Sequence, residues 1–121
     1  MRVGMINRLP NAGRATIKRE KIMSYLLAFD HPQGRGKALF FSRFGFTADR
    51  WHDLSDALLN HARECKVIET LDNAFGRKYI VEGPLSGLDG RAPIVRAVWF
   101  IAEKAQSPVF VTAFPGKEGQ Q

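Results

Sequence analysis

Four polar side chains in the second half of the sequence have types and spacings that suit anion binding and proton transfer. Lys78, Glu82, Arg96 and Thr112 each lie inside a segment rich in β-branched and aromatic residues. Alternate residues of a strand point to the same face, so we predict that these four side chains share one sheet face. A guanidinium fork suits phosphate oxygens, a carboxylate can accept a proton, and a threonine hydroxyl can donate to an anion. We expect Lys78, Arg96 and Thr112 to meet in a common cleft.

The same residues also fit an ordinary solvent-exposed sheet face whose polar side chains keep the protein soluble. Arg96 argues against this interpretation, because it lies in mid-segment with Ile94 and Val98 on the same predicted face. Such a position favours a site residue or an ion pair with Glu82. The sequence leaves both interpretations open.

His61 occupies a position where a hydrophobic residue is expected. Trp51, Leu54, Leu58 and His61 are spaced as one stripe of an α-helix, so the imidazole points where the tryptophan and the leucines point. A histidine there is either a core residue bonded to backbone carbonyls or a working acid or base. Because His61 is near the helix end, we predict that it reaches the edge of the cleft.

If the chain acts on RNA, these residues could take part in cleavage without a metal ion. The 2′-OH is then the nucleophile, and the protein supplies a base, an acid for the 5′-oxygen and cations for the phosphate. His61 could be the acid or base, Glu82 the alternative base, and Arg96 with Lys78 or Arg91 the phosphate clamp. The predicted catalytic set is His61, Lys78, Glu82, Arg96 and Thr112.

Other kinds of site have little support in the sequence. No HExxH, CxxC or GxSxG motif occurs, and Cys65 is the only cysteine. We therefore expect no metal, no cofactor and no internal disulfide. The 121 residues fit one domain, and no apolar run is long enough to span a bilayer or resembles a signal peptide, so we expect a cytoplasmic protein.

Positive charge is concentrated at the start of the chain. The whole sequence has a formal net charge of +6, and residues 1–21 carry six Lys and Arg but only Glu20 as an acid. Such a basic arm, over about residues 1–16, either attracts a polyanion such as RNA or is simply a solvated leader. A short tail is expected over 116–121. The candidate RNA contacts are Arg14, Lys18, Arg19, Lys37, Lys66 and Arg91.

Helical patterns precede strand patterns along the chain. Helices are predicted over 17–29 and 37–46, with Gly45 as a left-handed cap, and a long third helix follows Thr47 as N-cap. Strands are predicted over 66–71, 77–85, 93–102 and 108–114, and Asp89-Gly90 signals a hairpin. The predicted fold is α+β, with three N-terminal helices packed on one face of a four-stranded antiparallel sheet.

The alternation along the predicted strands divides their residues between two faces. The predicted core face carries Tyr79, Val81, Val95, Ala97, Trp99, Ile101, Val109, Val111 and Ala113. The predicted half-polar face carries Lys66, Ile68, Thr70, Lys78, Ile80, Glu82, Ile94, Arg96, Val98, Phe100, Phe110, Thr112 and Phe114.

Several longer motifs resemble those of a known family. They are "HPQGRGKALFF", "GFTADRWHDLSDALLNHA", "EGPLSGLDGR", "VRAVW" and "VTAFP". Together they resemble an uncharacterised bacterial domain family found at the C-termini of polymorphic or contact-dependent toxins, and as stand-alone chains beside a small partner gene. The chain departs from that family at Lys18-Arg19, where Asp-Pro is common, and at Phe75, where tyrosine is frequent.

The resemblance implies a toxin-associated protein with a cognate antitoxin or immunity protein as partner. Its helices-then-strands order is similar to the superfamily of barnase, the colicin ribonucleases and the RelE toxins, which implies a metal-independent endoribonuclease acting on RNA. The alternative is a non-enzymatic protein- or RNA-binding module, either of antitoxin or immunity type or an accessory subunit. The shared face of Lys78, Arg96 and Thr112 favours the enzyme, whereas the lack of an evident acid and base pair favours the module.

Overall fold

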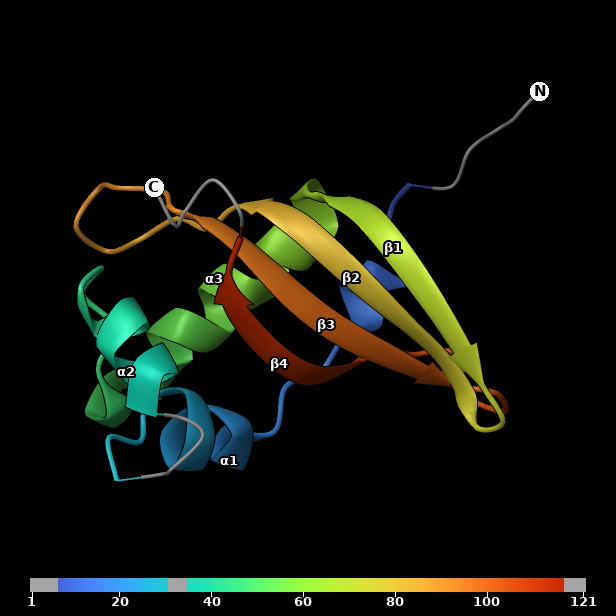
Figure 1. Cartoon of the computed structure of the whole chain (residues 1–121), viewed down its shortest axis with the longest axis horizontal. Coiled ribbons are helices and arrows are strands. Elements are labelled where there is room, and N and C mark those ends of the chain that lie inside the picture. Colours follow the sequence, from blue (N-terminus) through green and yellow to red (C-terminus); the bar gives the residue numbers. More distant parts are fainter. Residues whose placement is uncertain (1–6, 31–34, 117–121) are drawn as a thin grey trace.

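The computed structural model describes residues 7–30 and 35–116 and has an α+β fold (Figure 1). The helical elements come first in the chain and the strands follow. Among the described residues no helix is long and apolar enough to cross a membrane. The helices are α1 (Arg19–Lys21), α2 (Arg35–Ser42) and α3 (Trp51–Glu64), with short 3₁₀ turns η1 (Ala12–Arg14) and η3 (Ala48–Arg50) and a π-helical turn η2 (Ile22–Leu26).

The second half forms the predicted four-stranded antiparallel sheet. Its strands are β1 (Lys66–Asn73), β2 (Gly76–Pro84), β3 (Ile94–Ala102) and β4 (Val109–Pro115), and they neighbour one another in chain order. The hairpin signal at Asp89-Gly90 is confirmed, because Gly90 has a φ of 89° in the connection between the antiparallel strands β2 and β3. Glycine tolerates this left-handed conformation without a Cβ clash.

The first predicted helix is shorter than expected. Instead of continuing to residue 29, the chain passes from α1 into the wider turns of η2, which end at Leu26. A π turn holds more residues than an α turn and therefore rotates the face that the following residues present. Ile22 and Leu26 are buried as predicted, but Phe29, predicted for the same face, is 52% exposed.

The later helices largely agree with their sequence signals. Gly45 has a φ of 98° after α2, as predicted. Thr47 precedes η3 rather than α3 itself and makes no side-chain capping bond. In α3 the stripe of Leu54 and Leu58 is completely buried.

The edge strand β1 contains a bulge that changes which residues face the core. Val67 pairs with Val81 of β2 and Glu69 pairs with Ile80, so Ile68 is the extra residue. An extra residue reverses the alternation beyond it. Thr70 was predicted for the half-polar face, but it lies opposite Tyr79 on the core face, and that prediction is wrong.

A second bulge has the same effect in β4, the other edge strand. Thr112 pairs with Val98 and Phe110 pairs with Trp99, which leaves Val111 as the extra residue. Phe110 therefore packs edge-on against Trp99 in the core, and Val109 is 39% exposed. The predicted faces of Phe110 and Val109 are both wrong, whereas that of Thr112 holds.

The hydrophobic core lies between α3 and one face of the sheet. Val81, Val95, Ala97, Trp99 and Ala113 are fully buried, as the alternation predicted. In Figure 1, α3 lies behind the sheet while α1 and α2 lie beside the β4 edge. The other face of the sheet has no described helix across it.

The described part of the predicted basic arm packs on the fold. Asn7 accepts a hydrogen bond from the amide of Val67, and Thr16 forms a parallel bridge with Val109. Leu9, between them, is only 3% exposed. The segment 7–16 thus runs from the β1 edge to the β4 edge. Residues 1–6 of the arm and 117–121 of the tail lie outside the described residues.

Candidate functional site

The sheet face away from the core carries most of the polar residues singled out by the sequence. The strand register places them in rows that run across the sheet. The first row contains Lys66, Glu82, Arg96 and Phe114; the second contains Glu69, Ile80, Val98 and Thr112; the third contains Leu71, Lys78, Phe100 and Val109.

Glu82 and Arg96 form an ion pair in the first row. Arg96 Nε donates to Glu82 Oε2 at 2.7 Å, and the two side chains are 26% and 24% exposed. Partial burial reduces the screening of this pair by solvent. Within residues 7–30 and 35–116 Glu82 is the hydrogen-bond partner of Arg96, and the bond uses Nε alone. The two terminal nitrogens of the guanidinium keep their donors for another acceptor.

A glycine lets the end of β4 approach this ion pair. Gly116 follows β4, and its amide donates to the carbonyl of Ile94 at 2.8 Å. A Cβ at this position would lie 3.0 Å from Glu82 Oε2 and 2.7 Å from Ile94 Cγ2. The close approach encloses one side of the Glu82 carboxylate and helps to fix its orientation.

Thr112, in the second row, contacts a tyrosine from the helical half. Its hydroxyl donates to the Tyr25 hydroxyl oxygen at 3.3 Å. Lys37 of α2 and Lys21 of α1 place their Nζ atoms 5.3 Å and 5.9 Å from the centre of the Tyr25 ring. The site thus combines the strands with both helical elements that lie at the β4 edge.

The surroundings of Tyr25 make its phenol more acidic than usual. Burial alone raises the pKa of Tyr25, but the Thr112 hydrogen bond and the charges of Lys37 and Lys21 outweigh it, so the pKa is lower than the ordinary 10.0. Each of these groups stabilises the phenolate form. Tyr25 was not among the predicted site residues, because it lies in the apolar stretch "MSYLL" and only the tertiary fold brings it to Thr112.

Lys78 shares the predicted face but not the same part of it. It lies opposite Phe100 in the third row, four residues along β3 from Arg96. That spacing corresponds to about 13 Å along the strand. The prediction of a common face for Lys78, Arg96 and Thr112 is confirmed by the register, but Lys78 is separate from the Glu82–Arg96 pair.

His61 is a buried residue, and the prediction that it reaches the cleft edge is wrong. The residue is 2% exposed, and its Nε2, which must be the donor because carbonyl oxygens only accept, lies 3.1 Å from the Gly83 carbonyl oxygen and 2.9 Å from that of Val95. Nδ1 is buried without a hydrogen-bond partner among the described residues. Burial lowers the pKa of His61 despite these two bonds, which favours the neutral ring. The histidine ties the end of α3 to β2 and β3.

The predicted RNA contacts are spread over several parts of the surface. Lys37 is half-buried beside Tyr25, and Lys66 is exposed in the row of Glu82. Arg14, Lys18 and Arg19 are exposed; Arg14 bonds to Gln106 and Arg19 stacks 6.0 Å from the centre of the Trp51 ring. Arg91 donates to Asp89 and to the Arg43 carbonyl.

A hollow of about 430 Å³ adjoins the row of the ion pair. Its lining includes Lys66, Glu82 and Pro84, together with Cys65. Burial raises the pKa of the Cys65 thiol, which keeps it protonated and poorly reactive. The hollow therefore offers space beside the Glu82 carboxylate, with Lys66 as the cation at its rim.

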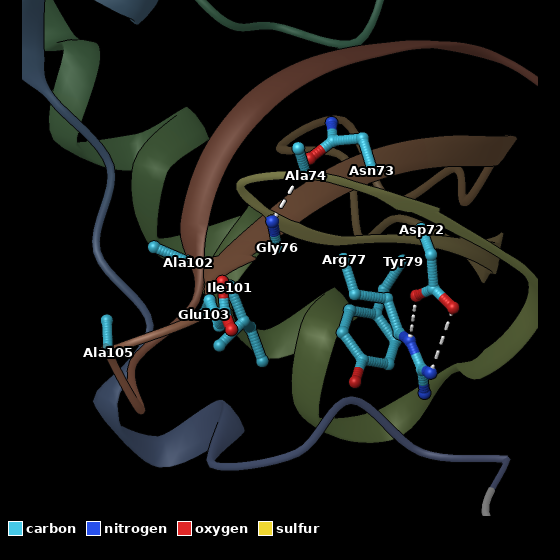
Figure 2. Close-up of a pocket in the computed structure, with 10 residues that line it drawn as sticks. All are labelled: Asp72, Asn73, Ala74, Gly76, Arg77, Tyr79, Ile101, Ala102, Glu103 and Ala105. Atoms are coloured by element: carbon cyan, nitrogen blue, oxygen red, sulfur yellow. Dashed lines mark hydrogen bonds and ion pairs between the residues drawn. The ribbon is translucent and has the colours of Figure 1, made fainter.

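A second hollow, of about 550 Å³, lies at the far end of the sheet (Figure 2). Arg77 faces the carboxylate of Asp72 there, with Tyr79 beside them, on the sheet face that carries Trp99. None of the predicted site residues lines it. Among the described residues no group of three or more His, Cys, Asp or Glu side chains is arranged to hold a metal ion.

Comparisons with known proteins give a structural likeness and a family. A chain from the "Contact-dependent growth inhibition toxin - immunity protein complex from Klebsiella pneumoniae 342" superposes with a TM-score of 0.69 at 15% identity, covering 88% of this chain and 97% of that chain. At this identity the likeness establishes a common fold. A comparison of the sequence with curated proteins gave no match. The model of the family "Domain of unknown function (DUF6883)" matches residues 8–117, so the chain belongs to the DUF6883 family.

Proposed function

We propose that this protein is a toxin-like, metal-independent endoribonuclease that a cognate partner protein neutralises. The observation that carries the proposal is the Glu82–Arg96 ion pair on the open sheet face that also carries Thr112. A base and a phosphate-binding cation are two of the groups that transesterification of RNA requires. Lys37, beside Tyr25, adds a second cation at the same edge of the sheet.

Each side chain has a definite role in this proposal. Glu82 removes the proton from the 2′-OH, and the 2′-oxygen then attacks phosphorus while the bond to the 5′-oxygen breaks. Arg96 binds the phosphate through its terminal nitrogens while Glu82 holds its Nε. Lys37 stabilises the negative charge that develops on the phosphate oxygens, while the Thr112 hydroxyl, which donates to Tyr25, lies on the β4 side of the site. Lys78 and Lys66 bind neighbouring phosphates rather than the reacting one.

The fold supports a partner protein. The structurally similar chain comes from a complex between a contact-dependent growth inhibition toxin and its immunity protein. That complex contains both kinds of chain, so a protein partner is common to either role. The net charge of +6 favours an acidic partner that covers the open sheet face. We propose a single domain acting on RNA in the cytoplasm, with the basic residues of 1–16 as additional RNA contacts.

A non-enzymatic binding module is the second candidate. The burial of His61 favours it, because the side chain with the best intrinsic pKa for proton transfer is withdrawn from the surface. In this case the open sheet face binds a partner protein, or binds RNA without cleaving it. The two candidates differ in whether RNA is broken.

Incubation of the purified protein with total RNA in EDTA tests the proposal. Wild-type protein is expected to cleave the RNA, and Glu82→Gln is expected to reduce the rate by about 10²- to 10⁴-fold. Glu103→Gln is the matched control, because Glu103 is an exposed carboxylate beyond the end of β3. Stable binding to RNA or to an acidic protein without cleavage would establish the binding module, and cleavage only with added divalent metal would overturn the mechanism.

A further inference from the structure

The proposed reaction needs an acid, and the burial of His61 leaves that role unfilled. Protonation of the departing 5′-oxygen requires a donor on the side of the phosphate opposite the base, because attack and departure are in line. Glu82 is on β2, and Arg96 on β3 is its direct neighbour. The acid is therefore expected on the β4 side of Arg96.

Tyr25 lies on that side. Its hydroxyl is 3.3 Å from Thr112 Oγ1, and Thr112 is diagonal to Arg96 across the β3–β4 pair. Neighbouring strands are spaced by about 4.8 Å, so the β2 and β4 backbones that carry Glu82 and Thr112 lie about 10 Å apart. That interval can hold one phosphate over Arg96, with the 2′-oxygen towards Glu82 and the 5′-oxygen towards Tyr25.

The surroundings of Tyr25 suit a group that gives up a proton. The Thr112 hydroxyl points its donor at the phenol oxygen, and two ammonium groups lie within 6 Å of the ring centre, at 5.3 Å for Lys37 and 5.9 Å for Lys21. These groups favour the phenolate and lower the pKa of Tyr25, although burial opposes them. A lower pKa brings the phenol closer to the range in which proton transfer is efficient near neutral pH.

We propose that Tyr25 is a catalytic residue that protonates the 5′-oxygen as it leaves phosphorus. This inference rests on the proposed ribonuclease function. The 2′-oxygen forms its bond to phosphorus and gives its proton to Glu82, while the phosphorus–5′-oxygen bond breaks and that oxygen takes the proton of the Tyr25 hydroxyl. The products are a 2′,3′-cyclic phosphate and a free 5′-OH. Thr112 and Lys37 stabilise the Tyr25 phenolate until solvent returns its proton.

A titration that does not depend on activity tests the environment of Tyr25. The chain has two tyrosines, so Tyr79→Phe leaves Tyr25 as the single phenol whose ionisation changes the ultraviolet absorbance. Tyr25 is expected to titrate below 10.0, and Lys37→Gln in the Tyr79→Phe background is expected to raise its pKa. A pKa at or above the ordinary value, unchanged by Lys37→Gln, overturns the inference.

Cleavage kinetics test the proton transfer itself. Tyr25→Phe removes the hydroxyl and is expected to lower kcat on RNA by about 10²- to 10³-fold, with RNA affinity nearly unchanged. Tyr79→Phe is the matched control and is expected to retain wild-type kcat. A substrate whose 5′-bridging oxygen is replaced by sulfur needs no acid, so wild-type and Tyr25→Phe proteins are expected to cleave it at similar rates.

The outcomes separate the inference from the proposed function. If the wild-type protein cleaves RNA and Tyr25→Phe does so at the same rate, the proposed role of Tyr25 is overturned while the ribonuclease function stands. The same conclusion follows if Tyr25→Phe lowers the rate equally on the oxygen and sulfur substrates. An intact Tyr25→Phe fold, seen by circular dichroism, excludes unfolding as the cause of a lower rate. Wild-type protein that cleaves neither substrate overturns both the inference and the ribonuclease.

Discussion

The Glu82–Arg96 pair is a polar feature on a sheet face that is otherwise half apolar. Val98, on the same face as Arg96, is only 7% exposed, and each partner of the pair is about one quarter exposed. At such partly buried positions the Coulomb attraction largely offsets the desolvation of the two charges, and an apolar pair of similar size would stabilise the fold as well. The pair therefore fits a role in binding better than a role in stability.

Replacing Arg96 by lysine separates charge from geometry. Arg96→Lys keeps the positive charge but loses both the Nε bond to Glu82 and the guanidinium fork. We expect kcat on RNA to fall by about 10- to 100-fold while the affinity for RNA changes by less than about threefold. Measurement of kcat and of RNA binding under the same conditions checks this. Wild-type values of both kcat and RNA affinity would mean that Arg96 contributes only its charge.

His61 makes stability depend on pH. In the unfolded chain His61 binds a proton around its ordinary pKa of 6.5, whereas burial lowers its pKa in the folded state. As the pH falls through 6.5, the unfolded state binds more protons than the folded state, so the free energy of unfolding decreases by up to about 1.4 kcal/mol per pH unit. The contribution is complete above the unfolded pKa and is lost as the pH falls towards the folded one.

Urea unfolding at about pH 7.5 and about pH 5.5 measures this effect, on either side of the unfolded pKa. Wild-type protein is expected to lose more stability between these values than His61→Gln, which cannot titrate at this position. Other titrating groups act on both proteins and cancel in the comparison. Equal losses would show that His61 takes up its proton normally in the folded state.

At the level of elements, the alternation of the sequence predicted the strands and the order of the sheet but not the bulges. Ile68 and Val111 are ordinary strand residues, and nothing in their type indicates that they are the extra residue of an edge strand. One extra residue puts the positions on its two sides out of phase, which is why Thr70, beyond the β1 bulge, and Phe110, before the β4 bulge, were assigned to the wrong faces. Thr112 was placed correctly because it lies beyond the β4 bulge, in register with Ala113 and the core.

The candidate site was predictable only where one strand register determines it. Glu82 and Arg96 are opposite one another in an unbulged pair, so alternation found them. Tyr25 meets Thr112 across 87 positions of sequence, and no local pattern reports such a contact. The helical stripe correctly placed His61 among Trp51 and the leucines, but a stripe cannot distinguish an enclosed helix end from an exposed one.

The β1–β2 hairpin depends on a glycine that is pressed against β3. A Cβ at Gly76 would lie 2.8 Å from both Ala102 Cα and Phe100 Cζ, and would also overlap the Ile101 carbonyl oxygen. We expect Gly76→Ala to lower the free energy of unfolding by about 1–3 kcal/mol. Gly36→Ala is the control, because α2 has open space there and alanine is the better helix former. A thermal midpoint for Gly76→Ala at or above that of Gly36→Ala would contradict this account of the hairpin.

The net charge of +6 on the whole chain is expected to govern the affinity for RNA rather than the chemical step. Arg14 and Arg19 are exposed and lie on elements outside the sheet. Their double replacement by glutamine is expected to weaken RNA binding and to reduce the slope of log affinity against log salt by up to about 1.4. Binding measured over a range of salt concentrations tests this, with kcat at saturating RNA as the control. An unchanged slope would place the RNA away from both residues.

The dependence of cleavage on the 2′-OH tests the proposed ribonuclease activity. Two oligonucleotides of one sequence, one of RNA and one with 2′-O-methyl groups throughout, are incubated with wild-type protein in EDTA. We expect cleavage of the RNA to 2′,3′-cyclic phosphate ends and no cleavage of the 2′-O-methyl strand, because the nucleophile is absent from it. Cleavage of both strands, or of neither, would contradict the proposal that this sheet face is a metal-independent ribonuclease site.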